Sequence, residues 1–324
     1  PHRSRADPGI VRGNMSAIVF PGQGSQRPGM GEDLYRNDTY ARQVFDQVES
    51  ATHINVATLC FESDEETLRR TDNAQLALYT CGLAAYYALQ GRVPQLKPAA
   101  MAGHSIGEYT ALAAAGVISV EDGARLVQRR GELMRGAGQT RPGTMAAVLG
   151  LDREALQAAL DEVADSGTVV IANDNCPGQL VISGDVDAVA RASAVATERG
   201  AKRVLPINVS GAFHSPLMTE SAAQMGAALL PELFHPSRIP IYSNVTAAPG
   251  EDWPRLLSQQ LESSVRWTES VQAMVADGHT RFIECGAGEV LTGLLRRITK
   301  DATGLKVVDL ASLEETANAL NAQP

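Results

Sequence analysis

The sequence predicts an α/β protein whose larger domain is built on a mostly parallel sheet, with a smaller domain inserted into it. Three observations support this fold class. Short apolar strands alternate with segments of helical periodicity along most of the chain, which is typical of a parallel sheet. Glycine-rich turns follow two of these strands. Residues 143–209 have a different order of strands and helices, and the first pattern returns after residue 215.

The composition is that of an ordinary globular protein. Its 324 residues are 44% hydrophobic, which is enough for a large buried core and more than one folding unit. The formal net charge is -9 and the chain has no long run of Lys or Arg, so we expect neither nucleic acid nor a membrane surface as a partner. The sequence has no apolar run of about 18 residues that could cross a membrane.

The cysteines and the N-terminal segment are informative about the cellular location of the protein. The four cysteines lie far apart and show neither a zinc-type spacing nor a disulfide framework, which favours a cytoplasmic protein and predicts no metal site. Residues 1–14 are polar and basic and lack the apolar centre of a signal peptide. We interpret them as a leader or an expression-derived tail that precedes a native start at Met15.

The larger domain is expected to begin with an apolar strand at 16–20, which leads into a glycine-rich turn. A second strand lies within 97–102, and a sharp turn and a short helix closed by Gly116 follow it. Ser119 then starts a capping box, which predicts a helix from 120 to about 137.

The smaller domain shows a strand, a helix, two strands separated by the turn Pro177–Gly178, a second helix ending at Gly200, and a last strand. This βαββαβ order is typical of a ferredoxin-like domain. We therefore expect the ferredoxin-like small domain to span 141–209. The large domain then comprises 15–140 and 210–324.

Ser105 stands in the order Gly103, His104, Ser105, Ile106, Gly107, which is the GxSxG pattern of a nucleophile elbow. Small residues on either side allow the chain to turn sharply from strand to helix and to lift the hydroxyl clear of the sheet. The N–H that follows the serine can then bind a developing oxyanion. The pattern also occurs by chance in glycine-containing loops. The flanking strand and helix favour the catalytic interpretation.

A serine nucleophile needs a base, and histidine is the usual one. Two of the six histidines remain as candidates after their contexts are considered, His214 and His235. His214 is favoured because it follows a strand, in a loop of small residues that can aim a side chain at a site. An Asp or Glu could orient the imidazole, but none stands out, and a backbone carbonyl can do the same.

Two further features point to a binding site. The glycine-rich turn has the first part of a dinucleotide-binding fingerprint, but Arg27 replaces its third glycine, which argues against a nucleotide site. We expect Gln23 in this turn to supply a second backbone N–H to the oxyanion hole instead.

Arg130 shares a helix face with Leu126 and Leu133, and a guanidinium buried there must be paired. Its partner is either an internal carboxylate or the carboxylate of a substrate, held bidentately.

Five motifs, taken in order, resemble the malonyl-CoA:acyl carrier protein transacylases and the related acyltransferase domains of polyketide synthases. The similarity runs from about residue 17 to 310, and the motifs are FPGQGSQ at 20–26, GHSIGE at 103–108, QRRGELM at 128–134, AFHSPLM at 212–218 and ECGAGEVLTGLL at 284–295. This resemblance implies an α/β-hydrolase-like large subdomain with a parallel sheet and an inserted ferredoxin-like small subdomain.

The resemblance also implies the catalytic roles. Ser105 is expected to be the nucleophile and His214 its base, with the backbone N–H groups of Gln23 and Ile106 forming the oxyanion hole. Arg130 falls where the family binds the free carboxylate of a malonyl group.

Other residues would shape or support the site by the same resemblance. Phe213, His104 and Asn173 are expected to contact the substrate, and Phe213 accompanies malonyl rather than methylmalonyl selection in the family. A backbone carbonyl near Arg266, in the segment SSVRWTES, is expected to orient the histidine.

The function that the resemblance implies is transfer of a malonyl group from malonyl-CoA to the phosphopantetheine thiol of acyl carrier protein, for fatty acid biosynthesis. The reaction would be a ping-pong transfer through a malonyl-serine ester. It would need no cofactor, and the protein is expected to be a monomer. The alternatives are a stand-alone acyltransferase of a polyketide synthase, an acyl-thioester hydrolase, and a silent carrier-binding module.

Because acyl carrier proteins are acidic, binding of the carrier calls for basic residues on this protein. The candidates are Arg125, Arg129, Arg135, Arg296, Arg297 and Lys300.

Overall fold

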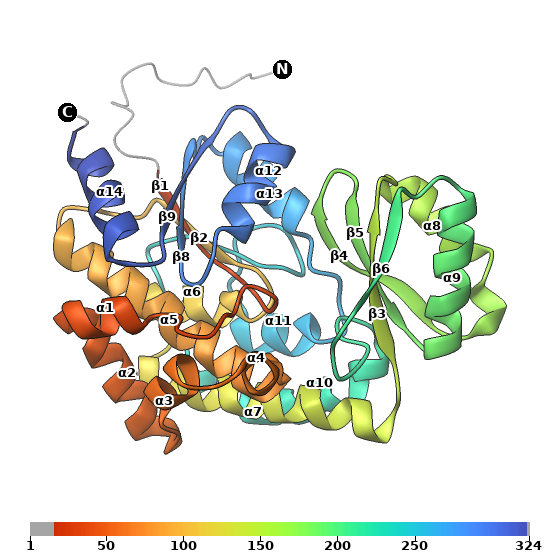
Figure 1. Cartoon of the computed structure of the whole chain (residues 1–324), viewed down its shortest axis with the longest axis horizontal. Helices are drawn as coiled ribbons and strands as arrows, with labels where there is room; N and C mark the ends of the chain where they lie inside the picture. The colour runs from red at the N-terminus through yellow and green to blue at the C-terminus, as the bar shows by residue number, and fades with distance from the viewer. Residues whose placement is uncertain (1–15, 323–324) are drawn as a thin grey trace, which may run out of the picture.

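The structure, a computed structural model, describes residues 16–322, so the leader expected at residues 1–14 and the start at Met15 lie outside it. Two separate sheets lie side by side in the molecule (Figure 1). The larger sheet has five parallel strands in the order β7-β2-β1-β8-β9. These strands are β1 (Ser16–Phe20), β2 (Ala100–Gly103), β7 (Ile241–Tyr242), β8 (Arg281–Cys285) and β9 (Thr303–Val307).

The central strand β1 is buried on both faces, and its alternating side chains enter two cores. Ile18 and Phe20 pack into the larger core, whereas Ala17 and Val19 pack into a smaller one. Helices α12 (Trp267–Ala276) and α13 (Val290–Ile298) cover the smaller core. The helices of the larger core are α1 (Glu32–Asn37), α2 (Thr39–Thr52), α3 (Val56–Phe61), α4 (Glu65–Arg69), α5 (Thr71–Arg92), α6 (Gly107–Ala114), α7 (Val120–Thr140), α10 (Thr219–Ala228), α11 (Trp253–Gln260) and α14 (Leu310–Asn321).

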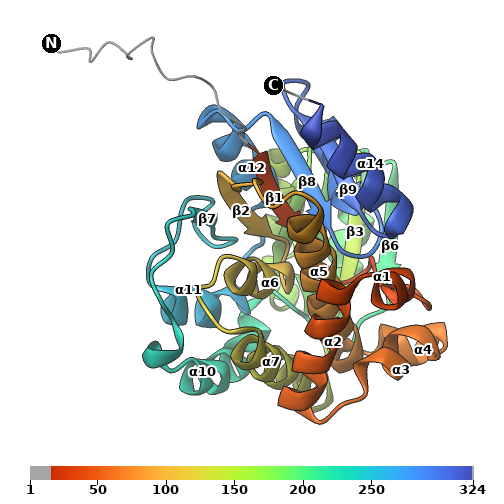
Figure 2. The same cartoon turned by 90° about the vertical axis from the view of Figure 1, so that its left-hand side faces the viewer.

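Helices therefore cover both faces of the parallel sheet, as Figure 2 shows for α12 on one side and α5 and α6 on the other. Short 3₁₀ turns complete the chain at η1 (Ala164–Ser166), η2 (Pro216–Met218) and η3 (Pro231–Leu233). Within residues 16–322, no helix combines the length and the apolar character needed to cross a bilayer.

The second sheet has four antiparallel strands in the order β4-β5-β3-β6. Helices α8 (Arg153–Asp161) and α9 (Val186–Glu198) pack together on one face of it (Figure 1). The strands are β3 (Thr144–Leu149), β4 (Val169–Cys176), β5 (Gln179–Gly184) and β6 (Arg203–Ile207). Chain order and strand order together are those of a ferredoxin-like domain, so the predicted fold class is confirmed.

The two sheets are joined through the edge strand β4. The N–H of Val265 donates to the carbonyl of Ala172 at 2.8 Å, and the N–H of Asp174 donates to the carbonyl of Val265 at 2.9 Å. The segment that leads into α12 therefore pairs with the small sheet. Just beyond the C-terminal end of β4, Arg297 donates to the side chain of Gln179 at 2.7 Å and to the carbonyl of Pro177 at 3.0 Å.

The expected capping of α7 is confirmed, because the side chain of Ser119 accepts the N–H of Asp122 at 3.0 Å. The helix continues to Thr140, three residues beyond the expected end near Ala137.

The turn between β2 and α6 has the strained geometry of a nucleophile elbow. Ser105 has φ of 51°, in the left-handed region that a residue with a side chain rarely adopts. The turn is so tight that a Cβ on Gly103 would lie 1.8 Å from the carbonyl carbon of Gly107. A Cβ on Gly107 would lie 2.2 Å from the carbonyl oxygen of Phe20, at the end of β1. Both glycines are therefore required by close backbone contacts.

The elbow predicts a strong and local stability effect. Gly103→Ala should lower the free energy of unfolding by about 3 kcal/mol, because backbone atoms must move to admit the methyl group. The matched control is Gly136→Ala, in the interior of α7, where no atom lies within 4 Å of an added Cβ. That control should raise stability by roughly 0.5–1 kcal/mol. Urea unfolding measures both, and equal stability of the two variants would contradict the elbow geometry.

Candidate active site

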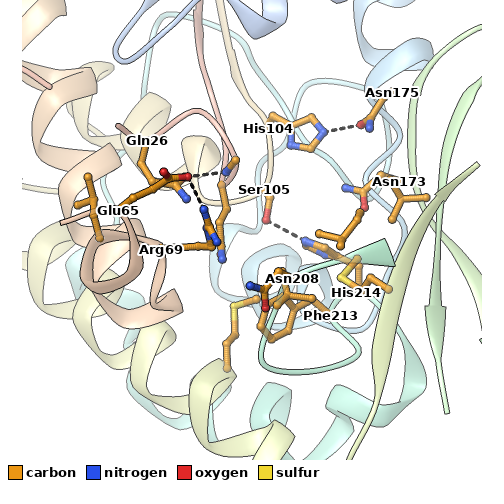
Figure 3. A pocket seen from close by; sticks show the side chains of 18 of the residues that line it. Gln26, Glu65, Arg69, His104, Ser105, Asn173, Asn175, Asn208, Phe213 and His214 are labelled. Carbon is orange, nitrogen blue, oxygen red and sulfur yellow. Dashed lines mark hydrogen bonds and ion pairs between the residues drawn. The ribbon is translucent and has the colours of Figure 1, made fainter. Parts of the chain in front are cut away.

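The elbow opens into a cavity of about 400 Å³ that lies between the two sheets. Figure 3 shows Ser105, His214, His104, Phe213 and Asn173 around it. The small sheet contributes apolar side chains to the wall, and these are Met145, Val181 and Ile207. No group of three or more His, Cys, Asp or Glu side chains that could hold a metal ion occurs in residues 16–322.

Ser105 and His214 form a hydrogen-bonded pair, with Oγ and Nε2 2.8 Å apart (Figure 3). The other ring nitrogen, Nδ1, lies 2.8 Å from the carbonyl oxygen of Gln260. A carbonyl oxygen can only accept, so Nδ1 carries the proton and Nε2 is free to accept the serine hydroxyl. The structure thus brings together the two residues that the sequence analysis paired, in a geometry that allows general-base activation of a serine.

The carbonyl of Arg266 itself does not orient the histidine, although Ser263, at the start of the segment SSVRWTES, also has a backbone hydrogen bond with His214. Arg266 is the N-cap of α12, and its carbonyl accepts the N–H of Ser270 at 2.9 Å in the first helical turn. Gln260 is instead the last residue of α11, where a carbonyl has no partner four residues further along the helix. That unpaired helix end accepts the proton of His214 Nδ1, and the N–H of His214 donates to the neighbouring carbonyl of Leu261 at 3.0 Å.

The surroundings keep His214 in its base form. Burial and, after it, the positive charge of Arg130 lower the pKa of His214 to about 3. The imidazole is therefore neutral near pH 7, which is the state that can take a proton from Ser105.

Arg130 lies behind the serine with 1% of its surface exposed. Its Nη1 donates to Gln75 Oε1 at 2.7 Å, and its Nη2 donates to Gln260 Oε1 at 2.8 Å and to Ser105 Oγ at 3.1 Å. In the described part of the chain these acceptors are amides and a hydroxyl, and no carboxylate is among them. The internal salt bridge that the sequence left open is thus not formed, and Nε has no hydrogen-bond partner within residues 16–322. A buried cation of this kind suits an incoming anion.

The other predicted residues also gather at the cavity. Gln23 lines it, and Ile106 is the N-cap of α6, directly after the serine. Phe213 and Asn173 are buried in its wall. His104 lies in the same wall, with Nε2 2.7 Å from Oδ1 of Asn175 (Figure 3).

The sequence analysis missed Gln75 and Gln260, which hold Arg130, and also two residues that hold the elbow, Asn244 and Glu108. Asn244 accepts the N–H of Ser105 at 2.7 Å and donates to the carbonyl of Gly103 at 2.7 Å, so it clamps the elbow. The carboxylate of Glu108 in turn accepts the N–H of Asn244 at 2.7 Å. Asn244 follows β7, beside β2, at the strand ends where parallel sheets carry their sites, and this position could have identified it. Glu108 has no comparable signal.

The neutral imidazole predicts that Ser105 remains reactive in mild acid. A histidine with the ordinary pKa is roughly 97% protonated at pH 5. Because the pKa of His214 lies at about 3, the pre-steady-state rate of acylation by p-nitrophenyl acetate at pH 5 should stay within about two-fold of that at pH 7. The rate is read at the isosbestic wavelength of nitrophenol. A ten-fold fall centred near pH 6.5 would argue against a depressed pKa.

Folding must be checked in the same experiment. An unfolded histidine binds a proton below pH 6.5, whereas buried His214 does so only near pH 3, so stability falls as the pH drops through this window. Circular dichroism at pH 5 separates that loss from a loss of the base.

Comparison with known proteins identifies the family to which the chain belongs. Residues 17–321 match the family described as acyl transferase domain. The chain is 41% identical over 302 residues to the malonyl CoA-acyl carrier protein transacylase of Bacillus subtilis, covering 92% of this chain and 95% of that protein.

Two solved structures extend the likeness to the fold. An acyl carrier protein S-malonyltransferase from Vibrio cholerae is 40% identical with a TM-score of 0.89, over 94% of this chain and 100% of that chain. A malonyl-transacylase solved in complex with a type II polyketide synthase acyl-carrier protein is 37% identical with a TM-score of 0.90, over 96% and 100% of the chains. The chain described above therefore belongs to the acyl transferase family, within its malonyl CoA-acyl carrier protein transacylases, and is an acyltransferase.

Proposed function

We propose that this protein transfers the malonyl group of malonyl-CoA to the phosphopantetheine thiol of an acyl carrier protein, through a malonyl ester of Ser105, and so supplies fatty acid biosynthesis. The observation that carries the proposal is the contact between Arg130 and the nucleophile, with Nη2 3.1 Å from Ser105 Oγ. An acyl group bound at Oγ would place a terminal carboxylate within reach of this guanidinium.

Acylation begins with attack of Ser105 Oγ on the thioester carbonyl. The hydroxyl proton passes to His214 Nε2, which lies 2.8 Å away. The N–H groups of Ile106 and Gln23 stabilise the oxyanion of the tetrahedral intermediate. The carbon–sulfur bond then breaks, and coenzyme A leaves as a thiol with the proton from His214.

Deacylation repeats these steps with a different nucleophile. The phosphopantetheine thiol gives its proton to His214 and attacks the malonyl ester, and Ser105 recovers its proton as the new thioester forms. Arg130 holds the malonyl carboxylate during both halves, so the reacting carbonyl stays aligned for the incoming thiol. The apolar side chains that the small sheet contributes to the wall limit the positions that water can take, which favours transfer over hydrolysis.

The acyl group is selected by charge and by size. Arg130 offers a buried positive charge, which an acetyl group would leave unpaired. Phe213 fills part of the cavity wall beside His214 and leaves less room for a branched malonyl group.

The first prediction of this proposal concerns the covalent intermediate. Intact-protein mass spectrometry after brief mixing should show one malonyl group on the wild type with malonyl-CoA, and little label with acetyl-CoA. Ser105→Ala should show none. Arg130→Ala should lose the preference for malonyl-CoA by about 100-fold, because a desolvated charge-assisted contact is removed.

A carrier protein with a phosphopantetheine thiol is then added to the labelled enzyme. Faster loss of the malonyl group to the carrier than to water supports a transacylase. Equal rates of loss would make the protein a hydrolase, and an unlabelled wild type would exclude the proposed intermediate.

A carrier of polyketide synthesis is the second candidate partner, with the same chemistry. The likeness to the malonyl-transacylase solved with a type II polyketide synthase carrier favours keeping it, at 37% identity. The kcat/KM values for the two kinds of carrier distinguish them.

Some of the basic residues considered for binding an acidic carrier already have partners within the protein. Arg125, Arg129 and Arg135 are each paired with a neighbouring carboxylate. Arg297 holds the turn between β4 and β5, so it has a structural task. Arg296 and Lys300, at the end of α13, are therefore the better candidates for a docking surface.

Charge reversal tests this docking surface. The double variant Arg296→Glu, Lys300→Glu should raise the apparent KM for the carrier by about five-fold, since rim charges act mainly on association. The KM for malonyl-CoA should not change. Arg191→Glu, on α9, is the control, because it reverses an exposed arginine on another helix. A carrier KM equal to that of the control would remove α13 from the interface.

A further inference from the structure

Glu108 is a buried carboxylate that the mechanism above leaves without a role. It lies in the first turn of α6, three residues after Ser105, and none of its surface is exposed. Its Oε1 accepts the N–H of Asn244 at 2.7 Å, and its Oε2 accepts a hydrogen bond from Nε2 of Gln260. The pKa of this carboxyl is raised to about 7, because burial outweighs the opposing effects of the Asn244 N–H, the Gln260 amide, the charge of Arg130 and the side chain of Ser243. Every one of these contacts favours the ionised, acceptor-only form.

Gln260 is the residue through which Glu108 can act on the site. The side chain is fully buried, and Nε2 uses its two hydrogens on Glu108 and on the carbonyl of Ser105, at 3.0 Å from the latter. Its Oε1 accepts from Arg130 at 2.8 Å. An amide has one donating end and one accepting end. Because a carboxylate and a carbonyl can only accept, Glu108 and the carbonyl of Ser105 together fix the donating end of Gln260 and turn its oxygen toward Arg130.

We propose that Glu108 is a positioning residue for acyl selection: by accepting from Gln260 it directs the amide oxygen that holds the Arg130 guanidinium. This inference rests on the proposed function, because it concerns the group that selects malonyl. The chemistry of Ser105 and His214 is held differently. His214 depends on the backbone carbonyl of Gln260, whose position does not change when the side-chain amide turns over.

Replacing the carboxylate with an amide of the same shape isolates this role. The backbone N–H of Asn244 cannot turn, so in Glu108→Gln the new amide oxygen is expected to keep that contact. Its NH₂ group then meets the NH₂ group of Gln260, donor against donor. Gln260 relieves this conflict by shifting or by turning over, and either change weakens the contact between its Oε1 and Arg130. Turning over also removes the donor to the carbonyl of Ser105, whereas the backbone contact between Gln260 and His214 Nδ1 is kept.

The matched control is Glu284→Gln. Glu284 is also fully buried, and its two oxygens accept the N–H groups of Leu291 at 3.0 Å and Thr292 at 2.8 Å, at the start of α13. Burial raises the pKa of its carboxyl as well. The substitution therefore costs the fold a comparable pair of contacts, in a part of the large domain that does not touch Ser105, His214 or Arg130.

The experiment measures KM and kcat for acylation of Ser105 by malonyl-CoA, acetyl-CoA and p-nitrophenyl acetate. In Glu108→Gln the KM for malonyl-CoA should rise by about 20-fold, and the preference for malonyl over acetyl should fall equally, as a lost contact to a charged group implies. The kcat for p-nitrophenyl acetate should stay within about three-fold, because that ester does not need Arg130. Glu284→Gln should keep the wild-type preference.

Gln260→Leu provides a second test that does not depend on the folding of Glu108→Gln. It removes the amide and keeps the backbone carbonyl, so it should lose malonyl preference to the same degree. Adding Glu108→Gln to it should change the preference by less than about two-fold, because both act through one contact. A folded Glu108→Gln that keeps the wild-type preference, or that loses all three activities in proportion, overturns the inference. So does a Gln260→Leu that keeps the preference.

Failure of the proposed function has a different signature. A wild-type enzyme that malonyl-CoA and acetyl-CoA label equally contradicts the proposed selection before any variant is compared, and this inference then falls with it. Normal malonyl labelling of the wild type with an unaltered Glu108→Gln contradicts this inference alone.

Discussion

The buried charge of Arg130 is the constraint on which the rest of the site depends. A guanidinium taken out of water needs acceptors, and here two glutamine amides and the serine hydroxyl supply them. Dipoles of this kind stabilise the cation without neutralising it, so the charge remains available to an anionic acyl group. The same charge, added to burial, keeps His214 in its base form. One buried cation thus sets the protonation state of His214 and, in the proposed function, binds the carboxylate of the acyl group.

The fold meets this constraint through a single segment between α11 and α12. Gln260 supplies a backbone carbonyl to His214 and a side-chain oxygen to Arg130, and Leu261 accepts the N–H of His214. Four residues later, Val265 pairs with β4 of the small sheet. The same short stretch therefore contacts His214, Arg130 and the small sheet, and it links the shape of the cavity to the position of the Ser105 and His214 pair.

Much of the fold and of the site could be predicted from the sequence, and there is a physical reason for each feature that could not be predicted. Strands such as β1 and the βαββαβ order of the small domain show clear periodicity and turn residues, and Ser105, His214 and Arg130 stand out by their contexts. The helix α5 gives little signal because it is buried around nearly its whole circumference, so it has no polar face. The carbonyl that orients His214 belongs to the main chain, which every residue type shares, and its assignment to Arg266 was therefore wrong. Asn244 and Glu108 act through long-range contacts that local patterns do not record.

The size of the cavity has a consequence for how the reaction runs in a mixture of substrates. A volume of about 400 Å³ suits one small-molecule ligand, and both the donor and the acceptor of the acyl group must bring a thiol to the same serine. The pantetheine arm of coenzyme A and that of the carrier protein therefore cannot occupy the cavity at the same time and must bind in turn. Free coenzyme A that rebinds to the acylated enzyme excludes the carrier and returns the acyl group to where it came from. Net flux through such a site follows the ratio of free coenzyme A to unloaded carrier, so the enzyme equilibrates two thioester pools and does not drive one into the other.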